Sequence, residues 1–326
     1  MLKVGFLGTG SMAKTMAKTV RMMPELCPYA VASRTQEKAE LFAAENGFQK
    51  AYGSYEALVS DPAVELVYIV TPHSDHAASM RLCIDHGKPV LCEKSFTLNA
   101  AQARDVLSYA EEKGVFVTEA IWTRYQPMAR TIREFAQSGR IGKLTSVSAN
   151  LAYPVSHRER VRDPKLGGGA LLDVGIYTLT FAALALGSRP LSVKADALLS
   201  EEGADLQNNI LLTYDGGVKV SLSSSIIGSS DRLGTICGTD GYAIVGNVNN
   251  YEYLDIYNVS HRFVERIERP QQLTGYEYQF RACIEALRAG KLECPEMPHA
   301  ETVAMMELMD SIRAQFPLVY PDEERA

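Results

Sequence analysis

Residues 2–13 read LKVGFLGTGSMA, a short apolar strand followed by a glycine-rich turn. The turn, Gly8 to Ala13, has the pattern G-x-G-x-x-A and opens a stretch of helical character at residues 11–22. Here Gly8 permits a sharp turn, Gly10 lets the backbone approach a pyrophosphate, and Ala13 allows close helix–strand packing. The helix N-terminus offers free N–H groups to phosphates. The pattern predicts dinucleotide binding, with a plain tight turn as the alternative, and the predicted contacts are Gly8, Thr9, Gly10, Ser11 and Met12.

The first 120 residues continue this alternation of strand and helix patterns, which is typical of βαβ units and a parallel sheet. We expect strands at 2–7, 29–33, 64–70, 89–92 and 115–119, and helices at 11–22, 36–46, 54–60, 76–86 and 100–113. The sequence therefore predicts an α/β protein whose residues 1–120 form an N-terminal, doubly wound Rossmann domain.

The pattern changes after residue 121, where strands with hairpin turns predominate. We expect strands at 144–153, 191–200, 209–214, 218–226, 233–237, 242–245, 251–259 and 262–267, and helices at 128–138, 170–186, 276–289 and 299–315. Short turns at 215–217 and 239–241 favour antiparallel hairpins. Residues 121–326 are thus predicted to form an α+β domain for substrate binding and oligomerisation, with a large, mainly antiparallel open sheet and helices on one face. A second copy of the chain can cover the other face, so we expect a homodimer or higher homo-oligomer.

Composition excludes several classes of protein. The 326 residues carry a net charge of −6, which argues against a nucleic-acid partner. Six irregularly spaced cysteines without a CxxC pair predict free thiols in a reducing cytoplasm. The chain starts directly with a strand-like run rather than a signal-peptide layout. The apolar stretch 170–186 contains Asp173, which a bilayer would penalise, so a buried helix and no membrane partner are expected.

The end of the second expected strand bears on cofactor choice. A fold specific for NAD usually has an acidic residue here to bind the ribose 2′-OH. This chain has Ser33 and Arg34, with Lys38 one helical turn later. A guanidinium and an ammonium suit a 2′-phosphate, so the sequence predicts NADP, with NAD possible. The alternative is an exposed arginine at a helix start.

Several motifs together resemble the glucose–fructose oxidoreductase / inositol dehydrogenase (Gfo/Idh/MocA) family. They are Gly8–Ala13, the segment Thr71-Pro72-His73-Ser74-Asp75-His76, and Glu93-Lys94-Ser95. Two further segments are similar to the dimeric dihydrodiol dehydrogenase / D-xylose dehydrogenase branch, namely Trp122-Thr123-Arg124 and the glycine-rich run from Gly167 to Tyr177. The resemblance covers nearly the whole chain.

This resemblance implies NADP(H)-linked oxidation of a sugar, polyol or cyclic diol, or the reverse reduction. Lys94 matches the active-site lysine, Tyr177 the tyrosine of the dihydrodiol branch, and Asp173 the acidic residue one turn earlier. One departure is Ser95, where the family has proline, and we expect its loss to loosen the loop that aims the lysine. The implied cofactor contacts are Thr71, Pro72, His73, His76, Glu93 and Lys94. The expected substrate contacts are Trp122, Arg124, Tyr153, Asp173 and Tyr177.

The chemistry of these residue types is consistent with that assignment. Hydride transfer from an alcohol to nicotinamide also moves a proton, which a side chain must take. Tyr177 can do this when a nearby ammonium such as Lys94 lowers its pKa. Asp173 and Tyr177, four residues apart, share one helix face, so Asp173 can orient Lys94 or bind a substrate hydroxyl. The alternatives are a core tyrosine, an aspartate that caps backbone N–H groups, and a surface lysine. Trp122 either packs in the core or forms a stacking wall.

Other functions remain open on the sequence alone. His73 and His76 have a spacing that metal ligands use, but no third ligand is apparent, so we expect no metal. An NADP-binding sensor or regulatory protein without turnover is one alternative to a dehydrogenase. A redox-neutral, NAD-dependent glycosidase-like enzyme is another.

Overall fold

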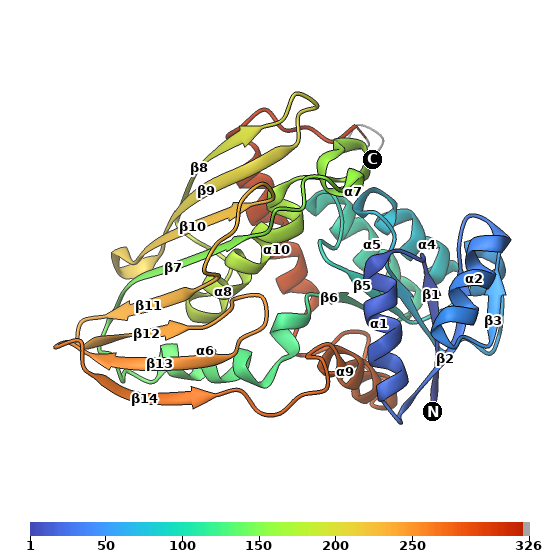
Figure 1. Cartoon of the computed structure of the whole chain (residues 1–326), viewed down its shortest axis with the longest axis horizontal. Coiled ribbons are helices and arrows are strands. Elements are labelled where there is room, and N and C mark those ends of the chain that lie inside the picture. Colours follow the sequence, from blue (N-terminus) through green and yellow to red (C-terminus); the bar gives the residue numbers. More distant parts are fainter. Residues whose placement is uncertain (322–326) are drawn as a thin grey trace. The chain divides into compact units, whose positions relative to one another are not determined.

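The computed structural model describes residues 1–321 (Figure 1). The chain forms two compact units. Among the described residues, the first unit contains Met1–Trp122 and Gln272–Thr302, and the second contains Thr123–Gln271 and residues 303–321. The domain division expected at residue 120 therefore differs from these units in one respect. Residues 272–302, which the sequence analysis placed in the second domain, pack with the first unit.

The first unit is built on a six-stranded, fully parallel sheet of order β3-β2-β1-β4-β5-β6. The order reverses between β1 and β4, the kind of switch point at which dinucleotides bind. β4, β5 and β6 are buried along their whole length, as expected for a sheet covered on both faces. The predicted Rossmann fold is confirmed. The strands are β1 (Leu2–Leu7), β2 (Leu26–Ala32), β3 (Lys50–Tyr52), β4 (Leu66–Ile69), β5 (Val90–Glu93) and β6 (Val117–Ala120).

The sequence analysis missed β3 because three residues at a sheet edge leave no apolar run to recognise. The helices of this unit follow the expected ranges closely. Thr35 accepts a hydrogen bond from the Lys38 N–H at the start of α2, and Asn99 does the same for the Gln102 N–H at the start of α5. The helices are α1 (Ser11–Met22), α2 (Gln36–Asn46), α3 (Tyr55–Val59), α4 (His76–Asp85), α5 (Ala100–Lys113) and α9 (Glu277–Arg288).

The second unit contains an eight-stranded sheet of order β14-β13-β12-β11-β7-β10-β9-β8. Only β7 and β10 pair in parallel, so the expected open, mainly antiparallel sheet is confirmed. The strands are β7 (Leu144–Ala152), β8 (Ser192–Leu199), β9 (Asp205–Thr213), β10 (Lys219–Ser225), β11 (Gly234–Gly238), β12 (Gly241–Val245), β13 (Tyr253–Asn258) and β14 (Phe263–Glu268). The helices are α6 (Pro127–Gln137), α7 (Glu159–Arg162) and α8 (Ile176–Leu186), with α10 (His299–Arg313) running from one unit into the other.

One face of this sheet is covered, because α8 packs on β7, β10 and β11 and also contacts α6. Side chains on the other face of β8 and β9 are exposed in alternation, including Leu198 and Leu211. The apolar stretch at 170–186 is not one continuous α-helix. It begins with a π-helical turn at Leu171–Gly175, and α8 follows. No helix within residues 1–321 is both long and apolar enough to cross a membrane. All six cysteines are free thiols.

Candidate functional site

The predicted cofactor residues gather at one edge of the first sheet. Gly8 follows β1, Ser33 follows β2, Thr71 lies just after β4, and Lys94 follows β5. Carboxyl ends of parallel strands lie at the same edge, which is where ligands bind in open α/β sheets. The sheet thus places all four predicted segments on its ligand-binding edge.

The glycine-rich turn has the geometry of an anion site. Gly8 has a φ of +111°, and a Cβ there would lie 2.8 Å from the carbonyl oxygen of Val70. A Cβ at Gly10 would meet nothing within 4 Å, so the space beside that backbone is open. No side chain caps the start of α1, and its first turn contains no acidic residue. Backbone N–H groups at this helix start are therefore available to a phosphate.

Ser33 lies beside this turn, and Arg34 and Lys38 follow it along the chain. The Oγ atoms of Ser33 and Thr9 are 3.5 Å apart, and the side chains of Arg34 and Lys38 are exposed. The sequence analysis missed Tyr55, the first residue of α3. Burial and the charge of Asp75 raise the pKa of Tyr55, while Arg34 acts in the opposite direction. Tyr55 is thus an electrostatic neighbour of Arg34 that no local pattern reveals.

His73 and His76 hold the loop that carries Lys94. Nε2 of His73 lies 3.1 Å from the carbonyl oxygen of Lys94. His76 is fully buried, with Nδ1 2.9 Å from the Ser95 carbonyl oxygen and Nε2 3.1 Å from that of Thr71. The two rings also meet edge to face, with centroids 5.5 Å apart. Two imidazoles therefore contact the carbonyl groups of the loop that is expected to loosen when Ser95 replaces proline.

The structure changes how His76 and Glu93 are interpreted. Burial lowers the pKa of His76 to about 4, so its ring is neutral at physiological pH and donates one hydrogen bond, to the carbonyl of Ser95 or of Thr71. Oε1 of the buried Glu93 accepts a hydrogen bond from the Tyr68 hydroxyl at 2.5 Å. Its Oε2 accepts one from the Lys94 N–H at 3.2 Å. Both residues support the backbone around Lys94, whose side chain is half-buried.

Thr71 and Trp122 complete the first unit's share of the predicted site. The Thr71 hydroxyl oxygen is buried and has no hydrogen-bond partner among the described residues. Because buried polar atoms are nearly always satisfied, this oxygen fits a bound group at the sheet edge. Trp122 is buried and stacks on Tyr276, with ring centroids 4.0 Å apart and planes 26° apart.

In the second unit, Asp173 and Tyr177 are brought to adjacent turns. Asp173 lies in the π-helical turn and Tyr177 in the first turn of α8, and both are buried. Arg160, from the short helix α7, donates a hydrogen bond from Nη1 to Oδ1 of Asp173 at 3.0 Å. The sequence analysis missed Arg160 because it lies in a mixed-charge loop that reads as solvated surface. The turn that precedes Tyr177 is thus held by an ion pair.

Tyr153 and Arg124 each have partners from distant loops of the second unit. Nδ2 of Asn249 donates to the Tyr153 hydroxyl oxygen at 3.2 Å, and Arg232 also hydrogen-bonds Tyr153. Arg124 is buried and interacts electrostatically with the Tyr251 phenol. Contacts made across about a hundred residues leave no pattern in the sequence.

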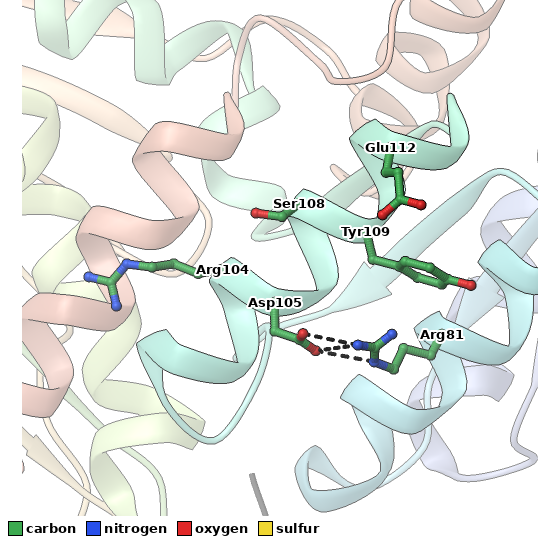
Figure 2. Close-up of a pocket in the computed structure, with 6 residues that line it drawn as sticks. All are labelled: Arg81, Arg104, Asp105, Ser108, Tyr109 and Glu112. Atoms are coloured by element: carbon green, nitrogen blue, oxygen red, sulfur yellow. Dashed lines mark hydrogen bonds and ion pairs between the residues drawn. The ribbon is translucent and has the colours of Figure 1, made fainter.

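A hollow on the outside of α4 and α5 is a weaker candidate. Figure 2 shows its lining, in which the guanidinium of Arg81 forms hydrogen bonds of 3.1 and 2.9 Å to the Asp105 carboxylate. The Tyr109 hydroxyl donates to Asp85. These residues come from the bodies of the helices rather than from loops at the carboxyl ends of strands, so the hollow is a surface ion-pair cluster. Within residues 1–321, no three His, Cys, Asp or Glu side chains are grouped as metal ligands. The hollow is lined by Arg81, Arg104, Asp105, Ser108, Tyr109 and Glu112.

Comparison with known proteins gives two family matches. A family described as "Oxidoreductase family, NAD-binding Rossmann fold" matches residues 2–121. A family described as "GFO/IDH/MocA C-terminal domain" matches residues 129–244. Trans-1,2-dihydrobenzene-1,2-diol dehydrogenase from Mus musculus is 34% identical over 337 residues, which cover 99% of both chains. The Homo sapiens protein of the same name is 31% identical over 332 residues, again covering 99% of both.

Solved structures share the fold over nearly the full length. A 3-ketoreductase from Actinomadura kijaniata, in complex with NADP and TDP-benzene, has a TM-score of 0.87 and 25% identity, covering 96% of this chain and 97% of that one. Levoglucosan dehydrogenase, in complex with NADH and levoglucosan, has a TM-score of 0.84 and 18% identity, covering 96% of both chains. At that identity the second likeness shows the fold alone.

Proposed function

Because the chain belongs to the Gfo/Idh/MocA oxidoreductase family, we propose that it transfers a hydride between NADP and a sugar, polyol or cyclic diol. At the coarser level it is an NAD(P)-dependent oxidoreductase of the dihydrodiol dehydrogenase and sugar ketoreductase kind. One observation carries the finer proposal. The uncapped start of α1 and the loop that bears Lys94, whose carbonyl groups contact His73 and His76, lie at the same edge of the sheet.

The residues at this edge fit a dinucleotide. The open space beside Gly10 and the free N–H groups of α1 suit the pyrophosphate. Arg34 and Lys38 supply positive charge for a 2′-phosphate. The unpartnered hydroxyl oxygen of Thr71 supports a contact near the nicotinamide. When bound, the nicotinamide accepts the hydride from the substrate carbon or supplies it.

We assign the proton transfer to the hydroxyl group of Tyr177. In oxidation its Oη takes the proton of the substrate hydroxyl, and in reduction it returns a proton to the same oxygen. The Lys94 ammonium stabilises the negative charge that develops on the phenolate and on the substrate oxygen. Asp173, held by Arg160, binds a neighbouring hydroxyl of the substrate. Trp122, Arg124 and Tyr153 line the substrate side. The diol named for the relatives at 31–34% identity supports a substrate with vicinal hydroxyls.

Turnover is tested by following absorbance at 340 nm with NADP and a panel of vicinal diols, polyols and sugars. We expect oxidation of at least one cyclic diol or sugar. Binding of NADPH without turnover on every substrate would favour the sensor instead. Bound NAD that never exchanges, with glycoside cleavage, would favour the redox-neutral enzyme.

The Tyr177→Phe variant tests the proton assignment, since it removes one oxygen and little volume. We predict a loss of about 10²–10⁴-fold in kcat, the range for general acid–base catalysis, with NADPH affinity nearly unchanged. Tyr214→Phe is the matched control, because the buried Tyr214 hydroxyl donates to the Gly187 carbonyl just beyond the C-terminal end of α8. That variant should lose stability and keep kcat. If Tyr177→Phe behaves in the same way, Tyr177 is a core residue.

We also propose that the chain forms a homodimer or higher homo-oligomer through the open face of β8 and β9. Leu198 and Leu211 are each 55% exposed there. Leu211→Glu should lower the mass measured by sedimentation, and an unchanged mass would remove this face from the interface. The six free thiols support a cytoplasmic location.

A further inference from the structure

The glycine-rich loop and the π-helical turn rest on a buried carboxyl group. Asp205, the first residue of β9, has no exposed surface. Its Oδ2 accepts a hydrogen bond of 2.8 Å from the Leu171 N–H and another of 2.8 Å from Nδ2 of Asn208. The nearby Ala170 N–H also favours the charged form of this carboxyl group. Asp205 therefore satisfies the first backbone donors of the segment that bears Asp173 and Tyr177, acting as an N-cap supplied by another strand.

The carboxyl group is the end of a buried hydrogen-bonded chain. Oδ1 of Asn208 accepts a hydrogen bond of 2.8 Å from the Ser224 hydroxyl, which comes from β10. Asn208 and Ser224 are both buried, at 0% and 2% exposure. Asp205, Asn208 and Ser224, here called the Asp205 chain, thus link two strands of the sheet to the start of the π-helical turn.

Two glycines show how closely the π-helical turn packs against the Asp205 chain. Gly169 has a φ of +130°, and a Cβ there would collide with Oδ1 of Asp205. A Cβ at Gly175 would lie only 3.1 Å from the Ser224 hydroxyl oxygen. The Asp205 chain therefore contacts the segment at both ends of the π-helical turn, and Asp173 lies between the two contacts. Such turns occur often at functional sites.

A buried carboxyl group needs a reason, because burial disfavours its charge and an apolar residue would fill the space without that penalty. Oδ1 of Asp205 has no hydrogen-bond partner among the described residues. Fold stability alone therefore does not favour an acid here. Its two hydrogen-bond donors are Nδ2 of Asn208 and the backbone N–H of Leu171, which lies six residues before Tyr177.

We propose that Asp205, with Asn208 and Ser224, is a positioning residue that fixes the π-helical turn and so aims Tyr177 and Asp173 at the substrate. This inference rests on the proposed proton-transfer role of Tyr177. Asp205 touches neither substrate nor cofactor in this scheme. It acts through the backbone donors of residues 170 and 171.

The test compares Asp205→Ala with Asp205→Asn in the full-length chain. Alanine removes the acceptor, and we expect kcat to fall by about 10²-fold, the effect of misplacing a reacting group by about 1 Å. The KM for the substrate and the Kd for NADPH should change only a few-fold. Backbone amides of residues 170–177 should exchange hydrogen faster. Asparagine keeps an acceptor oxygen at the Oδ2 position, so it should recover most of kcat and of the amide protection.

Asp255→Ala is the matched control. Asp255 is a buried aspartate of the same sheet, 6% exposed, and its partner is Arg266 through two hydrogen bonds of 2.5 and 2.6 Å. This variant should lose stability without losing kcat or amide protection at 170–177. An equal loss of kcat in both alanine variants would overturn the proposal, as would near-normal kcat in Asp205→Ala.

Two further measurements keep the test decisive. If Asp205→Ala does not fold, Ser224→Ala removes the last hydroxyl of the Asp205 chain, and we expect a several-fold lower kcat at unchanged KM. An unchanged kcat in that variant would overturn the inference. The amide exchange does not depend on activity, so it separates failure of the positioning role from failure of the Tyr177 assignment, which Tyr177→Phe tests.

Discussion

Arg34 is the residue on which cofactor choice depends. It follows the buried Ser33 at the end of β2, and its side chain is exposed. Thr35, not Arg34, caps α2, so the guanidinium is not used by the helix start. A planar guanidinium at this place is suited to hold a 2′-phosphate through two hydrogen bonds.

We predict that Arg34→Ala weakens NADP binding by about 1.5–3 kcal/mol, the range for a hydrogen bond to a charged group. NAD binding should barely change, because NAD lacks the 2′-phosphate. A fluorescence titration with each reduced cofactor measures both effects. Arg81→Ala is the control, since Arg81 is a half-buried arginine of the same unit that pairs with Asp105. Equal losses for the two cofactors would refute the 2′-phosphate assignment.

Single residues also mark the limit of sequence reasoning. The fingerprint at residues 8–13 is local, so its glycines could be assigned from spacing alone. Arg160 and Asp205 could not, because their partners lie 13 and 34 residues away and the contacts depend on how strands and loops meet. The roles of His73 and His76 were hidden for another reason. Their partners are backbone carbonyls, which look the same at every position of a sequence.

Among the elements, the lysine loop (residues 93–95) is the one that the structure reinterprets most. Its carbonyl groups lie against His73 and His76, and Glu93 accepts the Lys94 N–H. Nε2 of His76 also lies 3.1 Å from the Thr71 carbonyl oxygen, so one imidazole lies between the loops after β4 and β5. Side chains of η1 (His73–Asp75) and α4 therefore contact the carbonyl groups of the lysine loop.

We predict that His76→Ala lowers kcat by at least about tenfold while NADPH affinity changes only a few-fold, because a loosened loop misplaces the Lys94 ammonium. Steady-state kinetics and NADPH titration measure the two effects separately. His86→Ala is the control on the same helix, since His86 is half-buried at the C-terminal end of α4 and pairs with Glu56. A His76→Ala variant with normal kcat would show that the loop holds its shape without the imidazole.

The segment 170–186 shows a second limit at the scale of elements. Its continuous apolar run correctly predicted a buried helix, and the run is buried from Ala170 to Ala185. The change from π-helical to α-helical hydrogen bonding inside this run does not alter the pattern of apolar residues, so the sequence does not reveal it. The π-helical turn arises where Asp205 and Ser224 meet the backbone from the neighbouring sheet, and that meeting is a property of the tertiary fold.

For the whole molecule, the order of elements predicted both sheets but not the path of the chain between the units. Residues 272–302 return to the first unit, where the Val117 N–H donates to the Leu292 carbonyl at 3.0 Å. Nε2 of His299 lies 2.8 Å from the Val117 carbonyl oxygen, and the Phe280 ring is 5.9 Å from that of Tyr68. An amphipathic pattern shows that a helix has a buried face but does not identify the surface it packs on.

Two buried carboxyl groups, one in each unit, make the stability of the molecule depend on pH in opposite directions. Burial disfavours the charge of Asp61 in the first unit, but Lys50, Tyr52 and Tyr29 donate to it and hold its pKa well below the usual value. The stabilisation of the fold by the Asp61 carboxylate is therefore present above about pH 4 and is lost as the pH falls. Burial raises the pKa of Asp205 in the second unit to about 7.

The sign for Asp205 is reversed, because the folded protein binds the proton more tightly than the unfolded chain does. Its contribution is complete below about pH 4 and is lost as the pH rises through about 7. We predict that between pH 4 and 7 this group alone lowers the free energy of unfolding by up to about 1.4 kcal/mol per pH unit. Asp205→Asn cannot ionise and should remove this slope. Asp61→Asn should leave the slope unchanged and reduce the loss of stability below about pH 4. Calorimetric unfolding of the three proteins from pH 3 to pH 8 measures the free energy of unfolding in both pH ranges. If the wild type and Asp205→Asn change in parallel between pH 4 and 7, Asp205 is ionised throughout that range, and the N–H donors of Leu171, Ala170 and Asn208 outweigh its burial.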